Sequence, residues 1–115
     1  MESKIKNKWL KALRSGKYKQ GIDALKIDNR FCCLGVLCDI YAKEKKVAWV
    51  ESRDSKGQFL GESNVLPMTV VDWAGVEKHD PRVKNVMGYT TRTLSGLNDT
   101  GVSFKKIADI IEEQL

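Results

Sequence analysis

The stretch RFCCLGVLCD, residues 30–39, contains all three cysteines of this 115-residue chain. Its apolar run is too long for a surface strand, and the charged residues that follow Tyr41 and Ala42 predict a buried helix over about 32–45. Gly35 costs such a helix about 1 kcal/mol in propensity, so we expect another segment to pack closely against it. Core packing, a metal site, a redox centre and a catalytic nucleophile are the four possible uses of the cysteines.

Geometry favours core packing for the cysteines. In a helix, Cys32 and Cys33 would point about 100° apart and Cys38 would lie about 240° around from Cys32, so the three sulfurs do not converge. There is no C-x-x-C pair, and the single histidine, His79, lies in a polar segment, which supplies neither a chelate nor a base. Free cysteine among apolar neighbours behaves as a small buried hydrophobe. We therefore expect a core helix with no metal, no cofactor and no catalytic residue.

Other helices and short strands lie on either side of this segment. Ile5, Trp9, Ala12 and Leu13 recur at helical spacing, which places Trp9 in the core. The predicted helices span 3–15, 68–74, 90–97 and Phe104–Leu115, the last with Ser103 as its cap. A hairpin joins Val47–Glu51 to Gln58–Leu60, turns lie at Asp28-Asn29 and Asn98–Gly101, and Glu77–Asn85 is a loop or a short edge strand. This pattern predicts an α+β fold of about four helices around a small antiparallel sheet.

Length and composition predict one domain spanning residues 1–115. The net charge is +5, but residues 1–19 carry seven basic side chains and one acidic one, so the excess lies in a single segment. Lys4, Lys8 and Lys11 on the first helix could follow a nucleic-acid backbone, although most such lysine faces are simply solvated. No apolar run is long enough for a membrane span, and MESKIKNKWL has no signal core, so we expect a cytoplasmic protein without a membrane partner.

The final helix has an unusual charge order. Lys105 and Lys106 lie in its first turn, while Asp109, Glu112 and Glu113 lie toward its end, and both placements oppose the helix dipole. One explanation is pairing with charges on other elements. The other is an anion site, since free N–H groups at a helix start favour phosphate or carboxylate.

Four segments together carry a resemblance: WLKALRSGKYKQG (9–21), RFCCLGVLCDIYA (30–42), LPMTVVDWAGV (66–76) and LSGLNDTGVSFKKIADIIEEQL (94–115). They resemble a family of small uncharacterised proteins that are encoded by phages and prophages and also occur in bacterial genomes. The RFCCLGVLCD and LNDxGxSFxxIAxxIE signatures cover most of the chain. The resemblance transfers no catalytic residue. It implies a phage accessory protein in the host cytoplasm, and counter-defence is one role that such proteins take.

The leading functional hypothesis is a non-enzymatic module that sequesters a small anionic ligand, such as a nucleotide-derived signal. No phosphate-binding glycine loop, nucleophile elbow or metalloprotease motif supports an enzyme. The candidate ligand-binding residues are Arg14, Tyr18, Gln20, Arg30, Asn98, Asp99, Lys105 and Lys106, with cations for phosphate and Tyr18 for base stacking. The alternatives are an inhibitor that docks on a host protein, with Trp49 or Trp73 exposed as an anchor, and a nucleic-acid-binding protein that uses the first helix.

Overall fold

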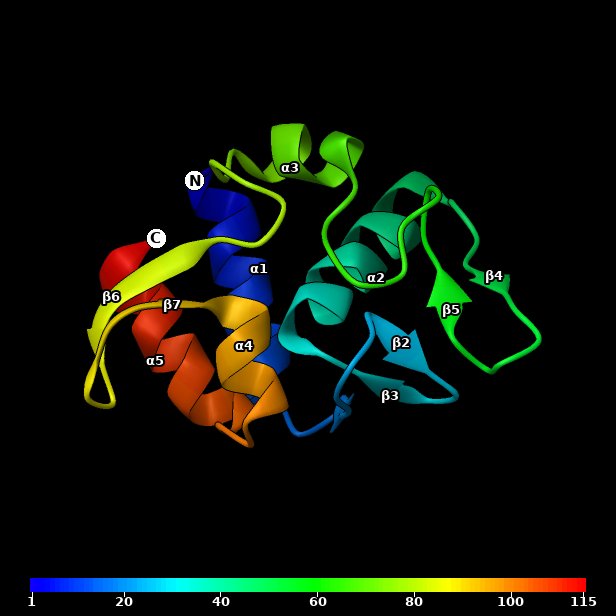
Figure 1. Ribbon diagram of the computed structural model, residues 1–115. Coiled ribbons are helices and arrows are strands. Elements are labelled where there is room, and N and C mark those ends of the chain that lie inside the picture. Colours follow the sequence, from blue (N-terminus) through cyan, green and yellow to red (C-terminus); the bar gives the residue numbers. More distant parts are fainter.

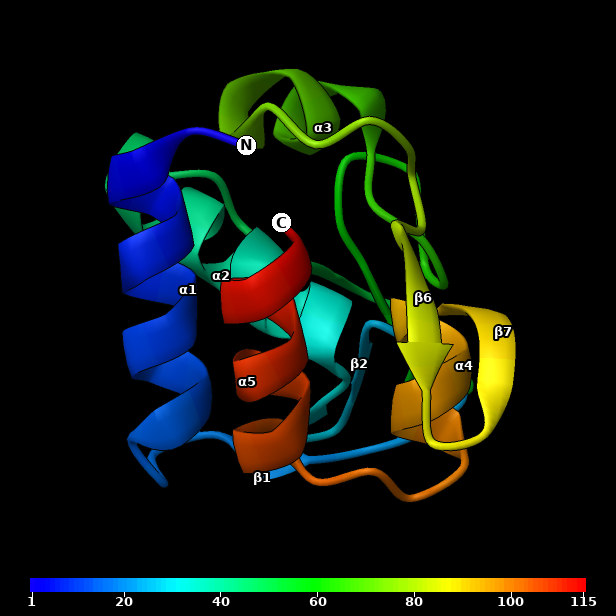
Figure 2. The same ribbon diagram turned by 90° about the vertical axis from the view of Figure 1, so that its left-hand side faces the viewer.

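The computed structural model describes residues 1–115 and contains five helices and seven short strands. Three helices form its centre: α1 (Ser3–Arg14), α2 (Cys33–Lys45) and α5 (Phe104–Gln114). α1 packs against both of the others and runs antiparallel to α5 (Figure 2). The apolar stripe of α1 faces this centre, and Trp9 is fully buried, which confirms the placement of this tryptophan in the core.

Two shorter helices complete the α-helical part. α3 (Met68–Ala74) lies across one end of the central helices, and α4 (Leu94–Asp99) packs on α2 and α5 (Figure 1). α3 follows Pro67 and ends at Gly75, whose φ of +71° suits glycine. Ser103 caps α5 by accepting the backbone N–H of Lys106 at 3.2 Å. The predicted bounds of α1, α2, α3 and α5 are therefore confirmed to within one residue.

The strands form three small sheets rather than one. β1 (Lys19–Gln20), β3 (Arg30–Phe31) and β2 (Lys26–Ile27) lie in that order, with β1 parallel to β3 and β2 antiparallel to it. The antiparallel pair β4 (Val50–Glu51) and β5 (Gly57–Gln58) is the predicted hairpin, shortened. β6 (Arg82–Val86) and β7 (Tyr89–Thr93) make the longest hairpin. The α+β class and the single domain are as the sequence analysis predicts.

The prediction of a helix over 90–97 is wrong in its first half. Tyr89–Thr93 is strand β7, and the helix begins only at Leu94. The β-branched threonines of YTTRT favour an extended backbone, and β6 supplies the pairing partner. α4 then continues to Asp99, so the predicted turn Asn98–Gly101 forms the end of this helix, where the N–H of Gly101 donates to the backbone oxygen of Asn98 at 3.1 Å.

The predicted core helix is the centre of the fold. Cys32, Cys33 and Cys38 are all buried and free of disulfide bonds, as expected of packing residues. Gly35 lies so close to the chain before β2 that an added Cβ would come within 1.8 Å of the carbonyl oxygen of Leu25. The expected close approach at this glycine is therefore confirmed.

Candidate functional site

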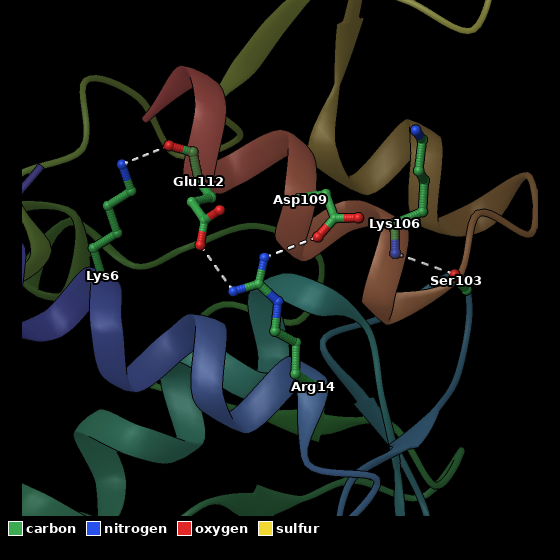
Figure 3. A network of polar contacts seen from close by, with 6 residues as sticks. All are labelled: Lys6, Arg14, Ser103, Lys106, Asp109 and Glu112. Carbon is green, nitrogen blue, oxygen red and sulfur yellow. Dashed lines mark hydrogen bonds and ion pairs between the residues drawn. The ribbon is translucent and has the colours of Figure 1, made fainter.

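The guanidinium of Arg14, the first candidate ligand residue, is already paired with acidic side chains of α5. Its guanidinium donates through Nη1 to Glu112 at 2.9 Å and through Nη2 to Asp109 at 2.8 Å (Figure 3). Lys6 adds a hydrogen bond to the backbone oxygen of Glu112 at 3.1 Å. These contacts explain Asp109 and Glu112 by pairing between helices, which is the alternative to an anion site for the charge order of α5.

Asn98 is fully buried, and all its hydrogen-bonding positions are filled. Its Oδ1 accepts from Gln20 Nε2 at 2.9 Å and from the backbone N–H of Cys33 at 3.2 Å. Its Nδ2 donates to the backbone oxygen of Gly21 at 2.8 Å and to Asp99 at 3.1 Å. This one amide therefore joins α4, the start of α2 and the end of β1, and offers no free group to a ligand.

Gln20 and Asp99 belong to the same network. Gln20 Nε2 also donates to the backbone oxygen of Val102 at 2.7 Å, and its Oε1 accepts the N–H of Phe104 at 3.2 Å. Asp99 accepts the backbone N–H of Asp23 at 3.1 Å. The structure thus brings together the predicted residues Gln20, Asn98 and Asp99, and each one ties segments of the fold.

Tyr18 is part of a second half-buried cluster. Its hydroxyl donates to Asp39 at 2.6 Å, and its ring meets Phe31 edge-to-face with centroids 5.2 Å apart. Lys43 pairs with the same carboxylate at 3.1 Å, and Trp49 donates to its other oxygen at 3.0 Å. Burial, together with the adjacent Asp39, raises the pKa of Tyr18. The tyrosine thereby anchors β1 to α2.

Arg30, Lys105 and Lys106 are the exposed cations of the predicted set that form no ion pair. Arg30 makes one long contact, 3.4 Å, to the backbone oxygen of Gln20. The two lysines form no ion pair, and the side chain of Lys106 extends away from Arg14 (Figure 3). The N–H groups of Phe104 and Lys106 are already bonded to Gln20 and Ser103. An anion at this helix start would therefore depend mainly on the lysine side chains.

A cleft of about 330 Å³ lies elsewhere, between the loop after α3, strand β6 and the end of α5. Three cations from two segments border it: Lys78 from the loop, and Arg82 and Lys84 from β6. All three are exposed, and no carboxylate lies within 4.0 Å of their charged groups. The lining residues are Met1, Gly75, Val76, Glu77, Lys78, Pro81, Arg82, Lys84, Gln114 and Leu115.

Comparison with protein families gives a match that spans residues 1–115. The chain belongs to the family described as Domain of unknown function (DUF8296). This confirms the coarser part of the predicted resemblance, membership of an uncharacterised family. No curated protein and no solved structure matches the chain.

The cleft of this DUF8296 chain was missed by sequence reasoning. The sequence predicts a polar loop or a short edge strand over Glu77–Asn85, and strand β6 confirms the second alternative, but the prediction does not relate the cations of this segment to one another. The signal was present in PRVKNV, where Arg82 and Lys84 alternate with the apolar Val83. That alternation places both cations on one face of a half-buried strand. Val83 is fully buried beneath them.

The cysteines of this DUF8296 chain lie in a setting that suppresses thiol chemistry. Burial raises the pKa of Cys32 to about 11, and it raises the pKa values of Cys33 and Cys38 well above the ordinary 9.0. Cys32 instead caps α2, since its sulfur accepts the N–H of Gly35 at 3.4 Å. No group of three or more histidine, cysteine or acidic side chains is arranged to hold a metal ion. None of the helices combines the length and apolar character that a membrane crossing requires.

A second hollow of about 330 Å³ lies beneath the tip of the β6–β7 hairpin. Met87 and Tyr89 border it and are 58% and 50% exposed. Arg92 stacks on the ring of Tyr89, with its guanidinium carbon 4.3 Å from the centroid. Trp49 and Trp73, the predicted anchors for a host protein, are half-buried in aromatic contacts instead. The exposed aromatic residue is therefore Tyr89.

Proposed function

We propose that this chain is a non-enzymatic binding protein that captures an anionic ligand in the cleft beside β6. The observation that carries the proposal is the set of three unpaired cations, Lys78, Arg82 and Lys84, around one hollow. Unpaired cations that converge on a concave surface favour phosphate or carboxylate groups. Arg82 offers a planar fork to such a group, while the two lysines offer mobile point charges.

The narrower form of this proposal is sequestration of a nucleotide-derived signal by a phage-type accessory protein, in the manner of counter-defence. Its support is the likeness of four segments to small phage-encoded proteins, together with the cations of the cleft. Lys105 and Lys106 at the start of α5 are the competing candidates for an anion site, because they too are exposed cations without an ion pair. The two sites can be separated by mutation.

Isothermal titration against cyclic nucleotides, ADP-ribose derivatives and pyrophosphate tests the proposal. We expect heat from at least one of these anions with the wild type at about 100 μM protein. The double variant Arg82→Gln/Lys84→Gln should lose binding by roughly tenfold, because two ion pairs at exposed positions are lost. Lys105→Gln/Lys106→Gln is the matched control, with the same change in charge, and should bind as the wild type does.

Comparison of the two variants shows whether the anion binds in the cleft beside β6 or at the start of α5. Loss of binding in the Lys105/Lys106 variant alone would move the site to the start of α5. No heat with any of the anions would remove the small-ligand form of the proposal.

Docking on a host protein is the second candidate function. The exposed Met87 and Tyr89 at the hairpin tip favour it, because apolar and aromatic side chains are the usual anchors of interfaces. A pull-down from host lysate should then retain a protein that Met87→Ser/Tyr89→Ser fails to retain. Equal retention by both chains would show that the hairpin tip is not the docking surface.

A further inference from the structure

Gln114 occupies the outer edge of β6 as a neighbouring strand would. Its Nε2 donates to the backbone oxygen of Lys84 at 2.8 Å, and its Oε1 accepts the backbone N–H of the same residue at 2.7 Å. A side-chain amide has the donor and acceptor of a peptide group, so these two bonds satisfy one residue of the strand edge. β7 pairs with β6 on its other side only.

The backbone of Arg82 faces the same outer edge. Hydrogen-bonding direction alternates along an antiparallel strand, so residues two apart direct their N–H and C=O groups to the same side. Lys84 directs its groups outward to Gln114, and Pro81 accepts from Leu94 on the β7 side at 3.0 Å. The backbone N–H and C=O of Arg82 therefore point to the outer edge, as those of Lys84 do. Both residues also line the cleft.

The charges along this outer edge determine which kind of strand can pair with it. Arg82 and Lys84 are exposed on either side of the buried Val83, and Lys78 stands across the cleft. A second copy of the chain would bring the same cations to the same edge, and like charges directly opposite one another are destabilising. An acidic strand would instead place a carboxylate opposite each cation.

We propose that an extended acidic segment of a partner protein adds to the outer edge of β6, in place of the side chain of Gln114. Its backbone pairs with Arg82 and Lys84, and its acidic side chains, two residues apart, lie opposite these cations. The inference rests on the proposed anion-binding function of the cleft. It adds that the anionic groups are the acidic side chains of a protein segment. A free phosphate would use the cations but would leave the alternating backbone groups unused.

Fluorescence anisotropy with labelled five-residue peptides tests this inference on the full chain. Glu-Val-Glu-Val-Glu should bind, and Gln-Val-Gln-Val-Gln should bind roughly tenfold more weakly, because the ion pairs to the cations are lost. A Glu-Val-Glu-Val-Glu peptide N-methylated at the amides that face β6 should lose most of its affinity, since it keeps the charge but cannot donate to the strand.

The variant Gln114→Ala distinguishes strand addition from simple charge attraction. Removing this amide frees the edge, so the acidic peptide should bind about fivefold more tightly, which corresponds to about one hydrogen bond no longer displaced. Pyrophosphate binding should not change. Glu113→Ala, one residue earlier on α5 and without a hydrogen bond or ion pair to β6, is the control and should bind the peptide as the wild type does.

Every result of the set supports or overturns the inference. Equal binding of the N-methylated and unmethylated peptides, or no gain in Gln114→Ala, overturns strand addition and leaves the anion site in place. Strand addition is also overturned if pyrophosphate binds through Arg82 and the acidic peptide does not bind. If neither pyrophosphate nor the acidic peptide binds, the proposed function of the cleft falls with the inference.

Discussion

Gly35 is the residue at which α2 meets the chain before β2. An added Cβ would lie 1.8 Å from the carbonyl oxygen of Leu25 and 2.7 Å from its carbonyl carbon. That oxygen also accepts the N–H of Cys32 at 3.2 Å, so the contact sits at the start of the helix. Backbone atoms cannot rotate away as the end of a side chain can, and an added methyl group must separate the two segments.

Gly35→Ala should therefore destabilise the protein. In an ordinary helix interior the same change stabilises by about 0.5–1 kcal/mol, whereas here we expect a loss of about 1–3 kcal/mol or more from overpacking. Urea denaturation followed by circular dichroism measures the difference. An increase in the urea midpoint would mean that Leu25 does not pack against this glycine.

Cys38 allows a second test at the residue scale. It is fully buried among apolar core residues. Cys38→Ser puts a hydroxyl into that site and should cost about 1–3 kcal/mol if the hydroxyl finds no partner. Cys38→Ala removes volume without burying a polar group and should cost less. The free energies of unfolding in urea give the comparison, and elemental analysis for zinc and iron checks that both changes act through packing.

The thiols should also resist labelling. With a pKa of about 11 for Cys32, only about one thiol in a thousand is ionised at pH 8, and the thiolate is the reactive form. We expect slow reaction of all three cysteines with a disulfide reagent in native buffer and rapid reaction in denaturant. Fast labelling of one thiol in the native protein would indicate an accessible cysteine and contradict the burial described above.

At the scale of elements, the Asn98 amide joins three segments that lie far apart in the sequence. Asn98→Ala would leave the buried N–H of Cys33 without its acceptor and the oxygen of Gly21 without its donor. Each unsatisfied group costs about 1–3 kcal/mol, so we expect a loss of about 3 kcal/mol in unfolding free energy. Asp99→Ala, at the next position, removes a partly exposed contact and should cost less. Similar losses in the two variants would contradict a central role for Asn98.

The helices could be predicted because their apolar spacing and caps are local. Gly16 after α1, Pro67 and Gly75 around α3, and Ser103 before α5 mark the ends of those helices in the sequence itself. The β6–β7 hairpin depends on pairing between segments, and its turn uses positive φ at Met87 and Gly88. Such a turn suits two-residue hairpins, so the glycine in NVMGYT was the available signal for it.

The candidate site was harder to predict than the helices. Gln20, Asn98 and Arg14 lie in segments that carry the family resemblance, and polar residues near helix ends fit a ligand site as well as an internal network. Only the fold shows that these side chains bond to one another and to distant backbone groups. The cleft forms only because the fold brings Lys78, Lys84 and Gln114 to one place, and no local sequence pattern relates these three positions.

The charge of the whole molecule is less concentrated than the sequence indicates. Among the cations of α1, Arg14 and Lys6 bond to α5, and Lys8 pairs with Glu44 of α2 at 3.5 Å. Lys4 and Lys11 remain exposed without an ion pair. Of the three lysines predicted to follow a nucleic-acid backbone, Lys8 therefore has an acidic partner within the protein, whereas Lys4 and Lys11 have none.

Binding to nucleic acid, if carried by α1, should consequently depend on Lys4 and Lys11 alone. We expect a weak, sequence-independent mobility shift at about 50 mM salt, where phosphate contacts are strongest. Lys4→Gln/Lys11→Gln should weaken it for every duplex and lower the salt slope by about one unit for each phosphate contact removed. Lys8→Gln is the control, since this lysine already has an acidic partner, and it should change the slope little. The absence of any shift at that salt concentration, or an unchanged slope in the double variant, would exclude α1 as a nucleic-acid surface and leave the cations of the β6 cleft as the stronger site for an anionic partner.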